Sequence, residues 1–110
     1  MIHKVRSWAH FFDAIAAGHK THDLRKDDRG YKVGDKLLLQ RYDNINGQYT
    51  GEELMVTITY MTDRDHPCAF SSSVLPPEYC ILSIKLDTEP KIDQAKLAAS
   101  LKVYMKEKNG

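Results

Sequence analysis

The sequence lacks the features that define several classes of small protein. It has two cysteines, Cys68 and Cys80, whereas a disulfide framework or a zinc site takes about four such residues. We therefore predict two reduced thiols, no metal and no cofactor. No apolar run approaches the roughly 18 residues that cross a membrane, and the charged side chains near the amino terminus do not fit a signal peptide. These absences favour a cytoplasmic protein with no membrane partner.

An excess of charge of one sign is also missing. The 16 Lys and Arg residues nearly balance the 15 Asp and Glu residues. The total charge therefore gives no reason to expect nucleic acid as the partner. The distribution is less even, because residues 20–36 contain six Lys or Arg against four Asp, and residues 91–110 contain five Lys against two acids. Both segments are locally basic, and the stretch between them is correspondingly acidic or neutral.

The chain has the length and apolar content of one domain, with 110 residues of which 42% are hydrophobic. Residues 2–6 favour a short strand, and Ser7 is a candidate N-cap for a helix over residues 8–17. Gly18 stands where a helix of this length would end. Large apolar side chains recur in it at helical spacing, namely Trp8, Phe11, Phe12 and Ile15. We predict that this helix plugs the core, and that Tyr42 also lies in the core.

Turn signals divide the rest of the chain into extended segments. Residues 19–26 favour a strand, and Asn46-Gly47 predicts a hairpin that joins a strand over residues 36–42 to one over residues 53–61. In the second hairpin strand one face is apolar: Leu54, Val56, Ile58 and Tyr60. Residues 79–86 favour a buried final strand.

Two segments lie outside this strand pattern. Residues 62–78 contain proline, serine and aspartate without periodicity, which predicts a long loop. Pro90 opens a predicted terminal helix with one apolar stripe, made of Leu97, Leu101, Tyr104 and Met105. We therefore expect an α+β fold: a small, partly open β-barrel of about five strands in residues 1–87, with a plug helix after the first strand, and a helical extension in residues 88–110.

The charged segment after Gly18 has two interpretations. As a strand, it places Asp23 and Arg25 on one face, about 7 Å apart, which is close enough to pair or to hold one ligand. Lys20 lies at the junction with the helix, where strict alternation need not hold. The other interpretation is a solvated charged strand of the kind common on protein surfaces. A metal site is not expected, because the three-residue spacing of His19 and His22 places them on opposite faces of a strand.

The order of residues in this segment resembles the ASCH superfamily, whose fold is the PUA-like β-barrel. The superfamily pattern is a glycine, a lysine, an acidic residue and an arginine, and this chain has Gly18, Lys20, Asp23 and Arg25 at the matching spacing. The continuation RKDDRGYKVGD, the hairpin YDNINGQYTG and the strand YCILSIKL resemble a bacterial and phage branch of that superfamily. The resemblance runs from His3 to Leu86. One departure is Asp23, where the superfamily more often has glutamate.

The resemblance implies a site beside the plug helix that accepts RNA or a modified nucleoside. Lys20 and Arg25 would contact phosphate, while Asp23 would orient Arg25 and accept a hydrogen bond from the ligand. Arg29 would extend the basic rim. Additional candidates are Tyr31 and Tyr49 for base stacking, because polar turn residues flank both, and His3 as a lining residue that the branch resemblance includes.

Two other functions stay open. Some relatives of the superfamily resemble amidohydrolases that remove the acetyl group from N4-acetylcytidine, which would make Lys20, Thr21 and Asp23 the catalytic candidates, with Lys20 as the base. Glu52 and Glu53 are the candidates for the partner carboxylate of such an enzyme. The third function is a protein-interaction domain that uses the terminal helix. We favour binding over catalysis, and the oligomeric state is open.

Overall fold

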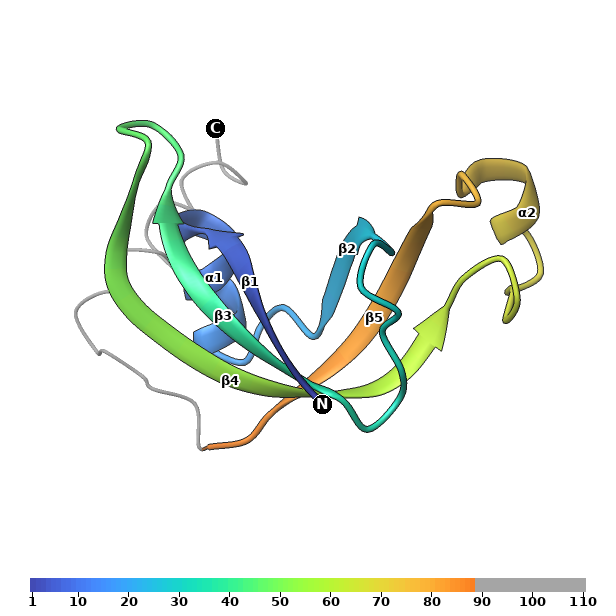
Figure 1. The fold of residues 1–110 in the computed structure, drawn as a ribbon, viewed down its shortest axis with the longest axis horizontal. Coiled ribbons are helices and arrows are strands. Elements are labelled where there is room, and N and C mark those ends of the chain that lie inside the picture. The colour runs from blue at the N-terminus through green and yellow to red at the C-terminus, as the bar shows by residue number, and fades with distance from the viewer. Residues whose placement is uncertain (89–110) are drawn as a thin grey trace, which may run out of the picture.

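The fold is a five-stranded mixed sheet that curves into a half-barrel (Figure 1). The structure is a computed structural model that describes residues 1–88. Its elements are β1 (Ile2–Trp8), α1 (Ala9–Ala16), β2 (His22–Lys26), β3 (Lys36–Asp43), β4 (Gln48–Thr62), α2 (Ser71–Val74) and β5 (Tyr79–Leu86). The strand order is β1-β3-β4-β5-β2, in which β1 and β3 are parallel and the other pairs are antiparallel. The predicted five strands and the helix after the first strand are confirmed. The predicted terminal helix, and with it the extension over residues 88–110, lies outside the described residues except for Thr88.

Strand β1 leads directly into α1. Alternate β1 residues are buried, so the strand has one inner and one outer face. The predicted N-cap is wrong, because Ser7 is buried within β1, Trp8 occupies the cap position, and no side chain caps the helix. The predicted end is confirmed: Gly18 follows the helix with a φ of 80°, a conformation that glycine adopts without strain.

Helix α1 contributes two side chains to the core. Phe12 and Ile15 are buried, and each such burial stabilises the fold by roughly 1.5–3 kcal/mol. The prediction that Trp8, Phe11 and Tyr42 also lie in the core is wrong. Trp8 and Phe11 are 50% and 45% exposed, and Tyr42 is only partly buried and does not belong to the core cluster. An eight-residue helix on a sheet can turn only one narrow stripe inward. The remaining core comes from Tyr31, in the segment between β2 and β3, and from the inner faces of the strands: Val5, Leu37, Leu39, Leu54, Val56, Ile58, Cys80, Leu82 and Ile84.

The β3–β4 hairpin has the predicted turn. Gly47 has a φ of 72°, and its N–H donates to the Asp43 carbonyl at 2.8 Å. The Asp43 carboxylate also accepts hydrogen bonds from the backbone N–H groups of Ile45 and Asn46 at 3.0 and 3.1 Å. The pKa of Asp43 is lowered mainly by a hydrogen bond from the Asn46 side chain, and these two backbone bonds lower it further. The turn is therefore fixed by local chemistry.

The inner face of β4 ends earlier than predicted. Leu54, Val56 and Ile58 are buried, but Tyr60 is 64% exposed. The pairing of β4 with β5 shifts register between Ile58 and Tyr60, and such an irregularity turns the following side chains relative to the sheet.

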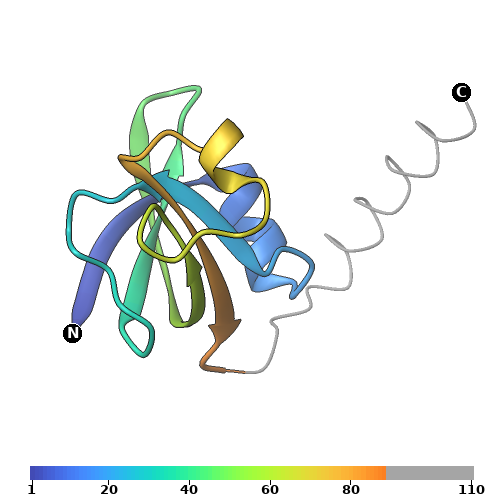
Figure 2. The ribbon, with the colours of Figure 1, turned by 90° about the vertical axis from the view of Figure 1, so that its right-hand side faces the viewer.

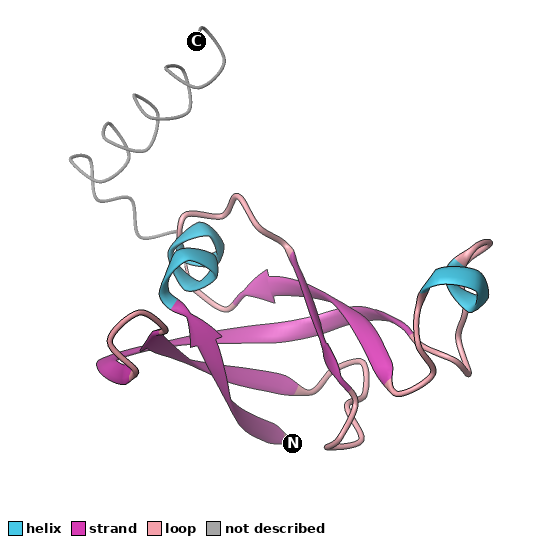
Figure 3. Cartoon of the chain, turned by 90° about the horizontal axis from the view of Figure 1, so that it is seen from above, coloured by secondary structure: helices cyan, strands magenta, loops and turns pink. Residues whose placement is uncertain are grey.

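The connection between β4 and β5 is not entirely a loop. It contains the short helix α2, whose Ser71 is buried and exchanges hydrogen bonds with the backbone of Cys68. Helices α1 and α2 lie at opposite ends of the curved sheet (Figure 3). The segment between β2 and β3 returns past the amino terminus (Figure 2), where Lys36 N–H donates to the Met1 carbonyl at 2.9 Å. No helix among residues 1–88 is long and apolar enough to cross a membrane.

Candidate functional site

Asp23 and Arg25 form an ion pair on one face of β2. Alternation along the strand is as predicted: these two side chains are partly buried, and their neighbours His22, Leu24 and Lys26 are exposed. The Arg25 guanidinium donates through Nε and Nη2 to the same Asp23 oxygen, at 2.9 and 2.7 Å. The pair is therefore a charge-assisted contact that fixes the direction of the guanidinium.

Arg25 also connects the two edges of the sheet. Its Nη2 donates to the backbone carbonyl of Arg6 in β1 at 3.2 Å. Since β1 and β2 are the first and last strands in the sheet order, this bond crosses the opening of the half-barrel. We call this opening, between β1 and β2, the seam. Arg25 consequently has a structural role that its position in the sequence does not reveal.

A groove of about 530 Å³ lies at the seam, and we call it the basic groove. It is lined by Lys4, Val5, Arg6, Arg25, Lys26, Asp28, Arg29, Tyr31, Gln40 and Tyr49. Five of these side chains are cationic, and Asp28 is the single carboxylate among them. Lys4, Arg6, Lys26 and Arg29 are exposed. The groove therefore presents positive charge to solvent and suits an anionic ligand.

Arg6 is held by two tyrosines on the outer side of the sheet. Its guanidinium lies 4.0 Å from the centre of the Tyr42 ring and 5.4 Å from that of Tyr49, and its Nε donates to the Tyr49 hydroxyl at 3.2 Å. This hydrogen bond raises the pKa of Arg6, which is charged in any case. Sequence reasoning missed Lys4 and Arg6. The sequence signal that could have revealed them is that Lys4 and Arg6 alternate with buried residues along the first strand, which places both cations on its outer face.

The two candidate stacking tyrosines have different environments. Tyr49 is 51% exposed, in agreement with the prediction. Tyr31 is 3% exposed, and its ring packs edge to face on His3 with 4.9 Å between centres. Burial raises the pKa of Tyr31, although Arg25 acts in the opposite direction. The Tyr31 ring is thus a core group that reaches the groove lining without offering a face for stacking, because the polar turn around it folds back onto β1.

His3 lies behind Tyr31 and does not line the basic groove. It is buried, and its Nε2 is 2.9 Å from an Asp35 carboxylate oxygen. Asp35 also accepts hydrogen bonds from the terminal amine of Met1 and from Lys32 N–H, each at 3.2 Å. The His3 hydrogen bond is the main cause that lowers the pKa of Asp35. In this position His3 joins β1 to the segment before β3.

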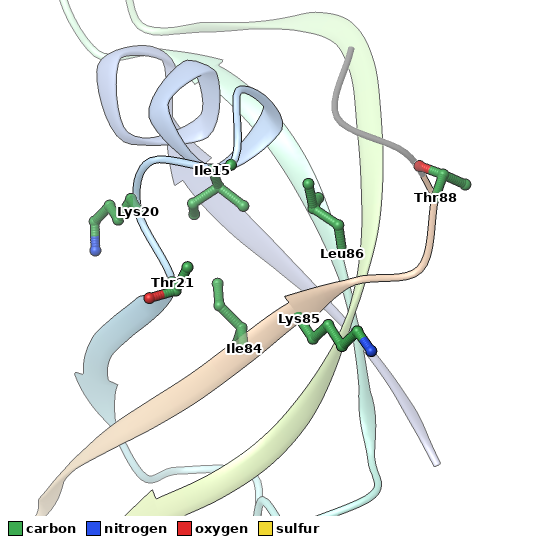
Figure 4. Close-up of a pocket in the computed structure, with 8 residues that line it drawn as sticks. Ile15, Lys20, Thr21, Ile84, Lys85, Leu86 and Thr88 are labelled. Atoms are coloured by element: carbon green, nitrogen blue, oxygen red, sulfur yellow. The ribbon is translucent and has the colours of Figure 1, made fainter. Parts of the chain in front are cut away.

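Lys20 and Thr21 line a different, smaller hollow of about 300 Å³ (Figure 4). Its other lining residues are Ile15, Gly18, Ile84, Lys85, Leu86 and Thr88. The apolar side chains point toward its centre, while the Lys20 ammonium group points away from them (Figure 4). That group donates to the His22 carbonyl at 2.6 Å. Lys20 and Arg25 therefore line different hollows. Their closeness in the sequence, with four residues between them, had suggested one common site.

Each carboxylate that was a candidate for catalysis has a contact with a residue other than Lys20. Asp23 is held by Arg25, and the lining of the smaller hollow, as far as residues 1–88 form it, has no carboxylate. Glu52 lies 3.6 Å from Arg41, and Glu53 accepts a hydrogen bond from Gln40 at 3.3 Å, both along the β3–β4 hairpin. Within the described residues, no group of three or more His, Cys, Asp or Glu side chains is placed to hold a metal ion.

The fold and the groove define a class: a half-barrel of mixed strands with a cationic groove where the sheet edges face each other. Residues 2–84 match the family described as "Domain of unknown function (DUF3850)", and the chain belongs to that family. It is also similar to the "Uncharacterized 12.9 kDa protein in GpA 3'region" of Escherichia phage P2, with 39% identity over 62 residues. That match covers 56% of this chain and 55% of the phage protein, so the chain spans about half the length of this relative.

Proposed function

We propose that the protein is a binding module for RNA or a nucleotide-like ligand, and that the ligand's phosphates bind in the basic groove. The observation that carries this proposal is the collection of five cationic side chains from β1, β2 and the following segment around one groove. Arginine and lysine are the residues that most often contact phosphate in protein–nucleic acid complexes. The resemblance to the ASCH superfamily and its PUA-like fold supports the same function.

The chemistry of the lining favours a polyanion over a small enclosed ligand. Sites for small molecules are mostly lined by apolar and aromatic side chains that enclose the ligand. Among residues 1–88, the lining is mainly charged, and Val5 is its one aliphatic member. A groove of this kind can neutralise successive phosphates of a chain, which suits RNA.

Salt-dependent RNA binding tests the proposal. We expect a labelled single-stranded RNA of mixed sequence to bind in fluorescence anisotropy, with an affinity that falls as salt rises. The slope of the logarithm of the binding constant against the logarithm of the salt concentration reports the number of phosphate contacts. Lys26→Ala and Arg29→Ala should each reduce that slope by about one contact. Both side chains are exposed, so the variants should fold normally. Arg64→Ala is the matched control, because Arg64 is exposed and lies outside the groove lining.

Two outcomes would remove the proposal. One is a lack of binding at low salt. The other is an equal loss of affinity for Arg64→Ala and for the two groove variants, which would show that only the overall charge matters.

The amidohydrolase of an N-acylated nucleoside is the second candidate, and it rests on one observation: Lys20 and Thr21 line the same hollow. In this function Lys20 would act as the base on a substrate of the N4-acetylcytidine type, and Asp23 would have to leave Arg25 to take part. Acetate release from acetylcytidine, abolished by Lys20→Ala, would support the enzyme. The same release by Lys20→Ala and by the unaltered protein would remove Lys20 from the mechanism.

A further inference from the structure

An exposed aromatic pair lies beyond the end of the basic groove, where β1 passes into α1. Trp8 and Phe11 stack with 6.2 Å between ring centres and 12° between ring planes, and about half of each side chain is exposed. We call this pair the aromatic platform. Within residues 1–88, the two rings together form an apolar surface that no other side chain covers, and such a surface is typical of a binding site.

The platform continues the line of the groove. Lys4, Arg6 and Trp8 occupy successive positions on the outer face of β1. Residues two apart on a strand are about 6.6 Å apart along it, so the three side chains form a row from the groove to the platform. A chain that contacts Lys4 and Arg6 can therefore reach Trp8 without turning.

Positive charge is present near both members of the platform. Arg6 precedes it on β1, and the Lys20 ammonium group lies 5.7 Å from the centre of the Phe11 ring. Lys20 thus contacts the platform at Phe11, whereas Arg6 adjoins it at Trp8 along β1. An apolar platform between cations complements a ligand that carries flat rings on an anionic chain, and single-stranded nucleic acid has that chemistry.

We propose that single-stranded RNA follows the outer face of β1, with phosphates at Lys4 and Arg6, bases stacked on Trp8 and Phe11, and a further phosphate at Lys20. This inference rests on the proposed function and specifies its ligand as single-stranded, because the bases of a duplex are not free to stack on a protein surface. It also places Lys20 on one binding path with the cations of the basic groove, although Lys20 lines a different hollow.

The chain's single tryptophan makes the platform directly observable. We expect an unlabelled single-stranded RNA to quench the fluorescence of Trp8, and the same RNA annealed to its complement to quench it much less. In a parallel anisotropy experiment with labelled RNA, Trp8→Ala and Phe11→Leu should weaken binding by about 5-fold to 150-fold, the usual effect of losing one stacked base. Trp8→Phe should keep most of the affinity, since it keeps a ring.

Tyr60→Ala is the matched control, because Tyr60 is an exposed aromatic residue on β4 outside the groove and the platform. It should leave the affinity unchanged. If Trp8→Ala does not fold, Phe11→Leu and the quenching of the unaltered protein still decide the question.

The two readouts separate this inference from the proposed function. RNA binding in anisotropy with unchanged Trp8 fluorescence and no effect of Phe11→Leu would overturn the platform and leave the groove. Equal binding and equal quenching by duplex would also overturn the inference. No RNA binding in anisotropy at low salt would remove both proposals and would leave a protein partner for the platform.

Discussion

At the scale of single residues, the two cysteines have opposite environments. Cys80 is fully buried, its Sγ is 3.5 Å from the Arg25 carbonyl, and burial raises its pKa to about 12. Cys68 is exposed, and hydrogen bonds from the backbone of Phe70 and from the Ser71 hydroxyl lower its pKa. Since the thiolate is the reactive form, the two thiols should differ strongly in reactivity.

We therefore predict that a maleimide modifies Cys68 in the native protein and reaches Cys80 only after unfolding. Mass spectrometry after short labelling, with and without urea, measures this difference. Cys68→Ser should abolish labelling of the native protein. Labelling of both thiols at similar rates without urea would show that the β2–β5 core opens readily.

The carboxylate of Asp35 predicts how stability depends on pH. Its hydrogen bonds with His3, the terminal amine and Lys32 N–H lower its pKa in the folded protein. A carboxyl group with a lowered folded pKa stabilises the fold fully above its ordinary pKa, and this contribution is lost as the pH falls through the folded value. We predict that Asp35→Asn lowers the urea midpoint at neutral pH and reduces the loss of stability between about pH 5 and about pH 2.

The comparison needs a carboxylate without such bonds. Asp65 is exposed, and its ion-pair contact with Arg64 spans 4.0 Å. Asp65→Asn should therefore keep both the midpoint and its pH dependence. A similar pH profile for Asp35→Asn and the unaltered protein would mean that other groups determine the acid sensitivity.

At the scale of elements, the β3–β4 hairpin depends on one backbone conformation. Gly47 has a φ of 72°, which costs a residue with a side chain about 1 kcal/mol or more, even though an added Cβ would meet only the Tyr42 hydroxyl at 3.7 Å. We predict that Gly47→Ala lowers the free energy of unfolding by about that amount in urea titration. Ile45→Ser, at an exposed position of the same turn, should change it little. Equal stability for both variants would show that the turn can change type.

The elements predicted correctly from the sequence are those that local chemistry determines. Asn46-Gly47 specifies its turn, and the alternation in β2 separates Asp23 and Arg25 from their neighbours. The burial of Tyr60 and Tyr31 was predicted wrongly, because it depends on contacts between distant segments. A register shift between β4 and β5 exposes Tyr60, and packing on His3 buries Tyr31.

The candidate site was predicted in part for the same reason. Strand alternation brings Asp23 and Arg25 together, but no local rule shows that Arg25 reaches the backbone of Arg6. Lys4 and Arg6 join the groove only because β1 and β2, far apart in the sequence, become the facing edges of one sheet. Such a site follows from topology, and the sequence pattern alone left the topology open.

At the scale of the whole molecule, the seam joins stability to the proposed binding. Arg25 holds Asp23 and the Arg6 carbonyl at once, through a guanidinium that is largely buried. Lysine has a single ammonium group and lacks the planar guanidinium, whose several N–H groups can donate to the Asp23 carboxylate and the Arg6 carbonyl at the same time. We predict that Arg25→Ala and Arg25→Lys both lower the free energy of unfolding by about 1 to 3 kcal/mol in urea titration, the usual effect of losing hydrogen bonds to a charged group.

Binding should separate these two variants. Arg25→Lys keeps the positive charge of the groove, so the salt dependence of RNA binding should stay close to that of the unaltered protein, whereas Arg25→Ala should make it less steep. Lys26→Ala is the reverse control, because Lys26 is exposed and lines the groove, and it should weaken binding without lowering stability. If Arg25→Lys were as stable as the unaltered protein, the hydrogen bonds of the guanidinium would not be needed to hold the seam closed. Arg25 would then contribute only its positive charge.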